Sequence, residues 1–367
     1  MKYEAILSPY VLNKKLVVKN RTVLAPMTNS QSYEDGIIGY DEIAWLEQCA
    51  EGDFGIIITA CASISLDAKG FDGQLSIAND SFIPGLHRLI QRLKKFQSIN
   101  IIQLCHPGSR APSRLNHLQP VAPSVFELQL PNFEVPRALD EKEIPLIVEQ
   151  FATAAIRAAA AGFNGIEILG ANGYLVTQFI SQSTNKRLDS YGGTLENRAR
   201  FVRDIIKACR KQTPEDFIVG LRISPEGPGL DIDENRIIAQ WAKDDGADYI
   251  HLSSVDWEKT AEPYPEQKIV QLFRVSLGDD FPIILTGGIQ TPDEATAALA
   301  SGASFVGLGR IAIGNPDWPR RIANDIQYQP RRPPYTTHYL KQIGITDRFI
   351  EYIRKVPLPI IAEDEEE

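Results

Sequence analysis

Residues 165–175 read Gly-Ile-Glu-Ile-Leu-Gly-Ala-Asn-Gly-Tyr-Leu, a short apolar run that passes directly into glycines, Asn172 and Tyr174. The run Gly165–Leu169 predicts a buried strand, because it is short, apolar and bounded by glycine. Polar groups, an aromatic hydroxyl and glycines make a poor core, but they suit a ligand site, which needs a few donors and close backbone approach. The stretch therefore predicts a strand with a binding site at its carboxyl end.

Similar short apolar runs recur along the chain and alternate with helical patterns. We expect eight strands, at Thr22–Ala25, Gly55–Thr59, Ile101–Leu104, Gly165–Leu169, Phe217–Ile223, Tyr249–Leu252, Pro282–Thr286 and Phe305–Gly307. We expect helices between them, at Asp41–Ala50, Ile83–Phe96, Glu143–Ala161, Leu195–Arg210, Glu234–Asp244, Lys268–Leu277 and Pro292–Ala300.

Local signals mark the ends of several of these helices. Thr291 precedes the last of them as an N-cap, with proline at its first turn. Gly162, Gly246 and Gly302 each follow a helix, where a residue in the left-handed conformation is expected.

This alternation predicts an α/β fold, a (β/α)8 TIM barrel in a single domain. A doubly wound open sheet is the alternative, but the first strand leads into Pro26–Ser30 and not into a Gly-x-Gly-x-x-Gly turn. The stretch Cys105–Asp140 reads as a long excursion after strand three, with a small hairpin around Ser124–Val135. We expect the barrel in residues 1–330, and a C-terminal helical extension with an acidic tail in residues 331–367, including one helix at Tyr335–Lys355.

Composition limits the function classes. The 367 residues are 43% hydrophobic and 23% charged, which is ordinary for a soluble globular protein. A net charge of −9 argues against a nucleic-acid partner, because phosphate backbones are bound by clustered Lys and Arg. An anionic cofactor stays possible, since backbone amides and one or two arginines can hold a phosphate.

The cysteines and the amino terminus favour a cytoplasmic location. Four widely spaced cysteines form no Cys-x-x-Cys pair, so we expect reduced thiols, with neither a disulfide scaffold nor a metal site. Residues 1–5 show no basic-then-apolar signal, and we expect no apolar run of the ~20 residues that cross a bilayer, hence no membrane partner. An oligomer is possible.

The longer pattern Gly170–Leu175, Gln178-Phe179 and Asn185–Arg198 resembles the signature of the Old Yellow Enzyme family, FMN-dependent oxidoreductases built on a TIM barrel. Further family-like motifs run from Arg21 to Trp318. The chain departs from the family at Leu169, where the usual residue is a histidine three positions before the Asn. Pro107 and an extra Ser109 also interrupt the family's Gln-Leu-x-His-Ala-Gly-Arg pattern, so only Gln103 is carried over from it.

The resemblance implies a set of FMN contacts at the strand ends. Thr28 would lie near the N5/O4 edge of the flavin and tune its potential, and Ala60 would let the backbone approach the ring. Gln103 would bind the pyrimidine edge, and Arg222 would face N1/O2, where negative charge gathers on reduction. Glycines and an arginine after strands seven and eight would hold the phosphate. The expected cofactor-binding residues are Ala25, Pro26, Met27, Thr28, Ala60, Gln103, Arg222, Gly287, Gly288, Gly309 and Arg310.

The resemblance also implies a reaction in two halves, in which NADH or NADPH reduces FMN and a small organic acceptor reoxidises it. Asn172 and Tyr174 are the expected catalytic residues, Asn172 holding the acceptor and Tyr174 donating a proton. Leu169 removes one donor, which typically lowers such a rate by ~10²–10³, so enone reduction should be weakened relative to quinones or nitro compounds. Alternatively, His106 or His117 could supply the second donor, although His106 reads more as a structural hydrogen-bonding residue.

These observations predict an FMN-dependent oxidoreductase that passes hydride from NAD(P)H to an activated alkene, a quinone or a nitro compound. One alternative is an FMN-binding barrel without a dedicated substrate, acting as a sensor or scaffold. Others are a dihydroorotate or dihydrouridine oxidoreductase and a flavin-free barrel that binds a phosphorylated ligand.

Overall fold

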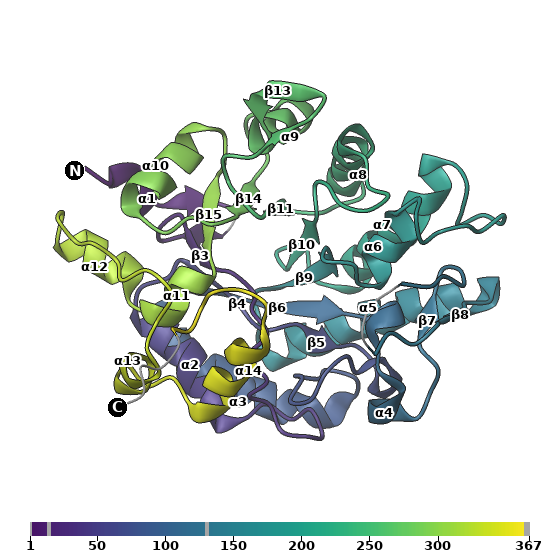
Figure 1. The fold of residues 1–367 in the computed structure, drawn as a ribbon, viewed down its shortest axis with the longest axis horizontal. Helices are drawn as coiled ribbons and strands as arrows, with labels where there is room; N and C mark the ends of the chain where they lie inside the picture. Colours follow the sequence, from purple (N-terminus) through teal and green to yellow (C-terminus); the bar gives the residue numbers. More distant parts are fainter. Residues whose placement is uncertain (1, 13–15, 129–131, 363–367) are drawn as a thin grey trace.

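The computed structural model describes residues 2–12, 16–128 and 132–362. Eight parallel strands pair side by side, and the β15–β3 and β4–β6 pairings close them into a barrel (Figure 1). Around the barrel the strands are β3 (Thr22–Leu24), β4 (Ile56–Ile58), β6 (Ile99–Cys105), β9 (Gly165–Gly170), β10 (Ile218–Ile223), β11 (Tyr249–Ser253), β14 (Ile283–Thr286) and β15 (Phe305–Leu308). Closure confirms the predicted TIM barrel and excludes the open doubly wound sheet.

Helices surround the strands, as Figure 1 shows. They are α2 (Tyr40–Glu51), α3 (Ile83–Leu93), α5 (Ile144–Ala161), α7 (Leu195–Gln212), α8 (Ile232–Asp244), α9 (Ile269–Leu277) and α10 (Pro292–Ala300). The Thr291 side chain caps α10 by accepting from the Glu294 amide, as its sequence predicts. Gly162, Gly246 and Gly302 have φ angles of 94°, 106° and 113°, which confirms the predicted left-handed helix ends.

Shorter elements fill the connections. They are α1 (Glu4–Leu7), β1 (Tyr10–Val11), β2 (Val17–Val18), β5 (Ala62–Ser63), α4 (Ser113–Asn116), β7 (Val121–Ala122), β8 (Arg137–Ala138), α6 (Leu175–Ile180), β12 (Thr260–Ala261), β13 (Tyr264–Lys268), α11 (Arg310–Gly314) and α12 (Trp318–Asn324). Single 3-10 turns are η1 (Leu66–Ala68), η2 (Asp80–Phe82), η3 (Lys94–Phe96), η4 (Gly108–Arg110) and η5 (Glu141–Glu143).

The barrel interior changes from apolar to polar along its axis. Every second residue of a strand points inward, so interior side chains stack in layers. At the amino end the interior is apolar, with Ile101 and Phe305 among its side chains, and the antiparallel pair β1–β2 covers it with the Tyr10 ring edge-on to Phe305 at 4.9 Å. Two positions further along, β6 and β9 present Gln103 and Glu167. The polar residues therefore lie near the carboxyl ends, where the site was expected.

The excursion after β6 differs from its prediction. Val121–Ala122 and Arg137–Ala138 pair in parallel, not as the antiparallel arms of a hairpin. The expected hairpin around Ser124–Val135 is therefore wrong for the described residues, and its centre at 129–131 lies outside them. Short-range turn signals do not encode a parallel pairing of two strands.

The C-terminal segment forms two helices where one was predicted. These are α13 (Thr337–Gln342) and α14 (Asp347–Lys355), separated at Gly344, which has a φ angle of 88°. Both contribute buried side chains, such as Leu340 and Phe349, to the layer between the strands and the outer helices. The boundary proposed at residue 330 stays a prediction, and the acidic tail 363–367 lies outside the described residues.

One helical stretch is long and apolar enough to cross a membrane by length and composition. It is Glu141–Ala161, formed by η5 and α5, although the sequence led us to expect no such run. Half of its apolar window is buried, and α5 packs between α3 and α7 on the outside of the barrel. This is the environment of a core helix, and the cytoplasmic location stays a prediction.

A close approach inside the barrel gives a stability test. A Cβ built on Gly220 of β10 would lie 2.1 Å from Cζ of the buried Tyr249 ring. Gly220→Ala should therefore lower the free energy of unfolding by about 1–3 kcal/mol or more, because this ring cannot move inside a closed barrel. Urea unfolding followed by circular dichroism measures the change.

The control is Gly85→Ala on α3. Its added Cβ would lie 3.3 Å from the side-chain atom Ile38 Cγ2, and alanine favours the helix, so stability should stay close to that of the wild type. Equal stability of Gly220→Ala and wild type would contradict the tight interior described above.

Candidate active site

A carboxylate lies at the centre of the polar layer. Glu167 accepts from Gln103 Nε2 at 2.7 Å, from the Tyr249 hydroxyl at 3.0 Å and from His251 Nδ1 at 2.8 Å. The other nitrogen of His251 lies 2.7 Å from the hydroxyl of Thr286. The three hydrogen bonds to Glu167 are buried and the contact with Thr286 is partly buried, so the network fixes the layer. Sequence reasoning missed Glu167, although a glutamate in an apolar strand is a signal that it needs partners.

The neighbours of Glu167 and His251 determine the protonation states of these two groups. Burial raises the pKa of Glu167, but His251, Arg222 and Gln103 together bring it below its usual range. Burial lowers the pKa of His251, although Glu167 opposes this. Glu167 is therefore ionised, and His251 is a neutral imidazole whose Nδ1 proton is donated to the carboxylate.

Arg222 lies beside this carboxylate with unused hydrogen-bonding capacity. It occupies the next inward position after Gly220 on β10, and its side chain is buried. Its Nε has no acceptor among the described residues. Burial lowers the pKa of the guanidinium, while Glu167 raises it. A buried guanidinium with free donors is costly by itself, so the position fits a ligand that supplies acceptors.

Apolar side chains surround Leu169, the residue that stands in place of the family's histidine. Leu169 packs in one buried cluster with Cys61, Cys105 and Ala171, and the ring of Tyr174 lies against it. The two thiols are close neighbours, since Gln74 Nε2 lies 3.8 Å from Cys61 Sγ and 3.7 Å from Cys105 Sγ. This side of the site is therefore drier than a histidine would make it.

Asn172 and Tyr174 lie together on the rim beside this cluster. Asn172 has a φ angle of 59°, its amide donates to the Ser224 hydroxyl at 3.0 Å, and its Oδ1 accepts from Ser253 at 3.4 Å. Burial raises the pKa of Tyr174 well above its usual value, and the neighbouring thiols add to this. Tyr174 is therefore a protonated phenol at neutral pH, able to donate.

The loop after β6 holds this rim in place through a residue not singled out from the sequence. Arg110 lies over the Tyr174 ring, 5.1 Å from its centroid, and donates to the carbonyl of Asn172. Gln178 of α6 donates to the hydroxyl of Ser109 at 2.9 Å and to the carbonyl of Gly173 at 2.8 Å. The inserted residue Ser109 is thus used to connect the loop to the Asn172–Tyr174 turn.

His106 has a structural position, as the sequence suggested. Its Nδ1 accepts from the amide of Gly108 at 3.1 Å, within its own loop. Burial lowers its pKa to about 4, so the ring is neutral at pH 7. His117 is exposed and ends α4 in the left-handed conformation, with a φ angle of 60°.

The end of strand one meets the end of strand eight. Ala25 and Pro26 are buried, and Met27 and Thr28 are half-buried after them. Met27 Sδ lies 3.6 Å from the position of a Cβ on Gly309. Ala60, the buried residue after strand two, is 5% exposed.

The glycines after strands seven and eight form an open backbone surface. Gly288 has a φ angle of 68°, and the amides of Gly288 and Gly309 have no protein acceptor in the part of the chain that the structure describes. Gly287 lies so close to the loop at Asp256 that a Cβ would be 3.0 Å from its backbone. Arg310 is half-buried and forms no ion pair with a described carboxylate. Free amides beside a free guanidinium fit a phosphate group.

The structure contains two cavities of several hundred Å³. One of about 770 Å³ opens beside Asn172 and Arg110 and is bounded on its far side by Phe126, Phe133 and Leu230. Its position makes it an approach to the Asn172–Tyr174 rim.

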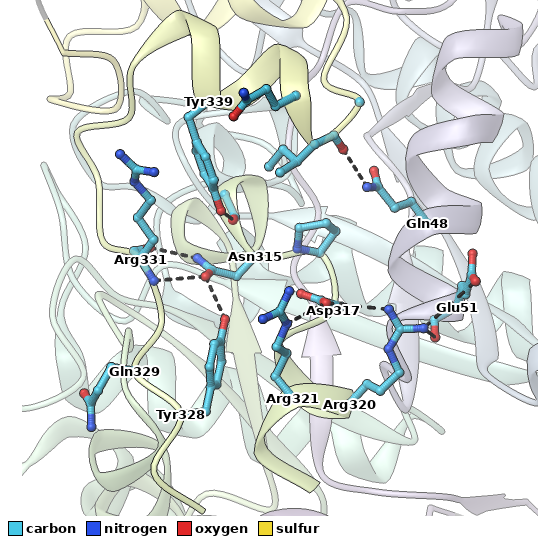
Figure 2. Close-up of a pocket in the computed structure, with 15 residues that line it drawn as sticks. Gln48, Glu51, Asn315, Asp317, Arg320, Arg321, Tyr328, Gln329, Arg331 and Tyr339 are labelled. Atoms are coloured by element: carbon cyan, nitrogen blue, oxygen red, sulfur yellow. Dashed lines mark hydrogen bonds and ion pairs between the residues drawn. The ribbon is translucent and has the colours of Figure 1, made fainter. Parts of the chain in front are cut away.

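The other cavity, of about 670 Å³, is shown in Figure 2 and contains none of the predicted site residues. There Asn315 donates from its amide to the carbonyls of Ile311 and Arg331, and its Oδ1 accepts from the Tyr328 hydroxyl and the Arg331 amide. An aspartate could not donate to those carbonyls, which explains the asparagine at this family position.

Comparison with known proteins assigns the family. Residues 6–329 match the model of the NADH:flavin oxidoreductase / NADH oxidase family. The chain belongs to this family. It includes Old Yellow Enzyme, so the resemblance found in the sequence is confirmed, and the protein is an NAD(P)H-dependent, FMN-binding oxidoreductase.

Known relatives are similar in sequence to this chain over most of its length. A probable NADH-dependent flavin oxidoreductase from Bacillus subtilis is 36% identical over 332 residues, 88% of each chain. An NADH:fumarate oxidoreductase from Klebsiella pneumoniae is 34% identical over 87% of this chain but only 36% of its own length. Among solved structures, morphinone reductase in complex with tetrahydroNAD has a TM-score of 0.80 at 29% identity, covering 94% of this chain and 97% of its own.

The pKa of His106 predicts a pH dependence of stability. The folded state resists protonation until about pH 4, whereas an unfolded histidine takes up its proton near pH 6.5. Stability from this group should be present above pH 6.5 and be lost as pH falls to about 4, by roughly 3 kcal/mol at most. His106→Gln keeps an acceptor for the Gly108 amide and should make this decline shallower, as measured by urea unfolding across pH 4–7.

His338→Gln is the matched control, because this exposed imidazole lies on α13, outside the site. It should follow the wild-type decline. If His106→Gln also follows that decline, a buried neutral His106 is excluded.

Proposed function

We propose that this protein passes hydride from NADH or NADPH, through FMN, to a small organic acceptor, and that the acceptor is an activated alkene, a quinone or a nitro compound. The observation that carries the proposal is the buried Arg222, which interacts electrostatically with Glu167 and whose Nε has no acceptor among the residues that the structure describes. FMN would supply the hydride chemistry there, accepting at N5 and delivering from it.

The chain's own residues would hold the cofactor at the strand ends. Arg222 presents a cation to the ring, and Gln103 is held in place by Glu167. Ala60 leaves room for close approach, and Thr28 offers a hydroxyl from strand one. Gly288, Gly309 and Arg310 offer free donors for the phosphate, and Gly287 sets the turn before them.

The acceptor would bind against Asn172, Tyr174 and the apolar cluster around Leu169. Tyr174 holds a proton that it can donate, and the thiols and leucine exclude water. On the strand-four turn, Asn172 offers an amide donor for the carbonyl, Tyr174 serves as the proton donor, and Leu169 offers no donor. Acceptors that need little carbonyl activation, such as quinones, are therefore favoured over simple enones.

Removing the Arg222 cation should release the cofactor. Arg222→Gln should weaken FMN binding about 10- to 100-fold, the effect expected on losing a charge-assisted hydrogen bond of about 1.5–3 kcal/mol. Flavin absorbance after gel filtration, compared with protein content, measures the loss.

The control is Arg203→Gln, which removes an equal charge from an ion pair with Asp245 on the outer helices. This variant should keep its flavin. Full flavin content in folded Arg222→Gln would remove the main support for the proposal.

Restoring the missing histidine should change the acceptor range. Leu169→His would add a donor to the apolar cluster, and the rate of enone reduction should rise by ~10²–10³ if no other residue already supplies the second donor. The measurement is anaerobic: the flavin is reduced with NADH, excess nucleotide is removed, and reoxidation by 2-cyclohexenone or menadione is followed by absorbance.

Menadione provides the internal control, since its rate should change little in Leu169→His. Fast reoxidation of the wild type by cyclohexenone, with no gain in the variant, would show that the site already has two donors. A flavin that neither NADH nor NADPH reduces would favour the alternative of a sensor or scaffold barrel. The observation that supports this alternative is the apolar cluster at Leu169, which stands where the family usually has a substrate-binding histidine.

A further inference from the structure

The C-terminal helix α14 reaches the mouth of the barrel. Thr346, just before the helix, accepts from Gln31 Nε2 at 2.8 Å, and Gln31 lies on the loop that follows strand one. The ring of Phe349 packs edge-on against Trp45 of α2, with centroids 5.6 Å apart. Figure 1 shows α14 in yellow next to α2, which it contacts through this ring pair. The helix is therefore attached to the loops that border the expected flavin position.

One face of α14 is directed at these loops. Arg348 and Tyr352 are four residues apart and so lie on the same side of the helix. Arg348 Nη2 lies 3.1 Å from the position of a Cβ on Gly73, in the loop after β5. On the opposite side, Ile350 and Ile353 are buried in the core. Packing on both sides fixes the direction of Tyr352.

Tyr352 is half-buried on this face of the helix. Burial raises its pKa, and a hydrogen bond with the Thr28 hydroxyl lowers it. Tyr352 also interacts electrostatically with Cys61 and Arg110, and Tyr174 interacts with it in turn. Cys61 and Tyr174 belong to the cluster around Leu169, so Tyr352 lies within electrostatic range of that cluster.

We propose that Tyr352 is an acceptor-binding residue, whose hydroxyl supplies the second hydrogen-bond donor that Leu169 does not. This inference rests on the proposed function. A phenol on the Thr28 side of the pocket can donate to an acceptor oxygen while accepting from Thr28. Together with Asn172 it would place two donors around one oxygen, in the way that an oxyanion site requires.

The test uses Tyr352→Phe in the holoenzyme. Reduction of the flavin by NADH should stay within about twofold of the wild type, because the nucleotide does not need this donor. Reoxidation by 2-cyclohexenone should slow by ~10²-fold, the loss expected for one donor of this kind.

A binding measurement separates this role from turnover. Cyclohexanone carries the same carbonyl but has no alkene to reduce, and its binding can be followed by the change in flavin absorbance. Its dissociation constant should rise about fivefold in Tyr352→Phe, as expected on losing one neutral hydrogen bond.

The matched control is Tyr339→Phe on α13, which also removes a buried hydroxyl from the C-terminal segment. That hydroxyl donates to the carbonyl of Gly314 at 2.7 Å, away from the barrel mouth. Both variants should lower the melting temperature slightly, but Tyr339→Phe should leave enone reoxidation and cyclohexanone binding unchanged.

Rescue distinguishes donor replacement from a packing effect. If Tyr352 replaces the missing histidine, Leu169→His should restore the enone rate of Tyr352→Phe to within ~10-fold of the wild type. Wild-type reoxidation and cyclohexanone binding in Tyr352→Phe would overturn the inference. A wild-type flavin that neither nicotinamide nucleotide reduces would instead remove the proposed function, independently of Tyr352.

Discussion

The site depends on one charge pair inside the barrel, the carboxylate of Glu167 and the guanidinium of Arg222. Neither group could be buried alone, because an unpaired charge at such a position costs several kcal/mol. Three donors hold Glu167, whereas Nε of Arg222 has no acceptor among the described residues. Because Glu167 is held by three donors, it also helps to fix the position of Arg222 at the expected cofactor site.

The barrel makes this arrangement possible through its two-residue period. Because Gly165, Glu167 and Leu169 are inward positions of one strand, they occupy successive layers of the interior. The same period places Gly220 beside the Tyr249 ring and Arg222 one layer above it. The polar layer thus lies between the apolar interior at the amino ends of the strands and the expected site at their carboxyl ends. A small residue such as Gly220 is needed where a large ring such as that of Tyr249 extends across the interior.

Fold and strand order could be predicted from sequence because they follow from local signals. Short apolar runs, the Thr291 cap and the glycines after helices each act within a few residues. Glu167 and Arg110 were missed because their partners lie on other elements, and only the folded chain brings them together. The excursion was misread for the same reason, since its parallel strand pair is set by the path of the chain over the barrel.

The position of Tyr352 shows why the end of the chain matters to chemistry at its centre. A donor at position 169 would be fixed by the hydrogen bonds of strand β9, among the most rigid parts of a barrel. A donor on α14 is held by side-chain contacts, among them the Phe349 ring on Trp45 and the hydrogen bond from Gln31 to Thr346. Loosening that packing would change the acceptor site while leaving Arg222 and Glu167 in place. With Tyr352 and Arg222 in the roles proposed for them, the selection of acceptors could vary with the C-terminal segment independently of cofactor binding by the closed barrel.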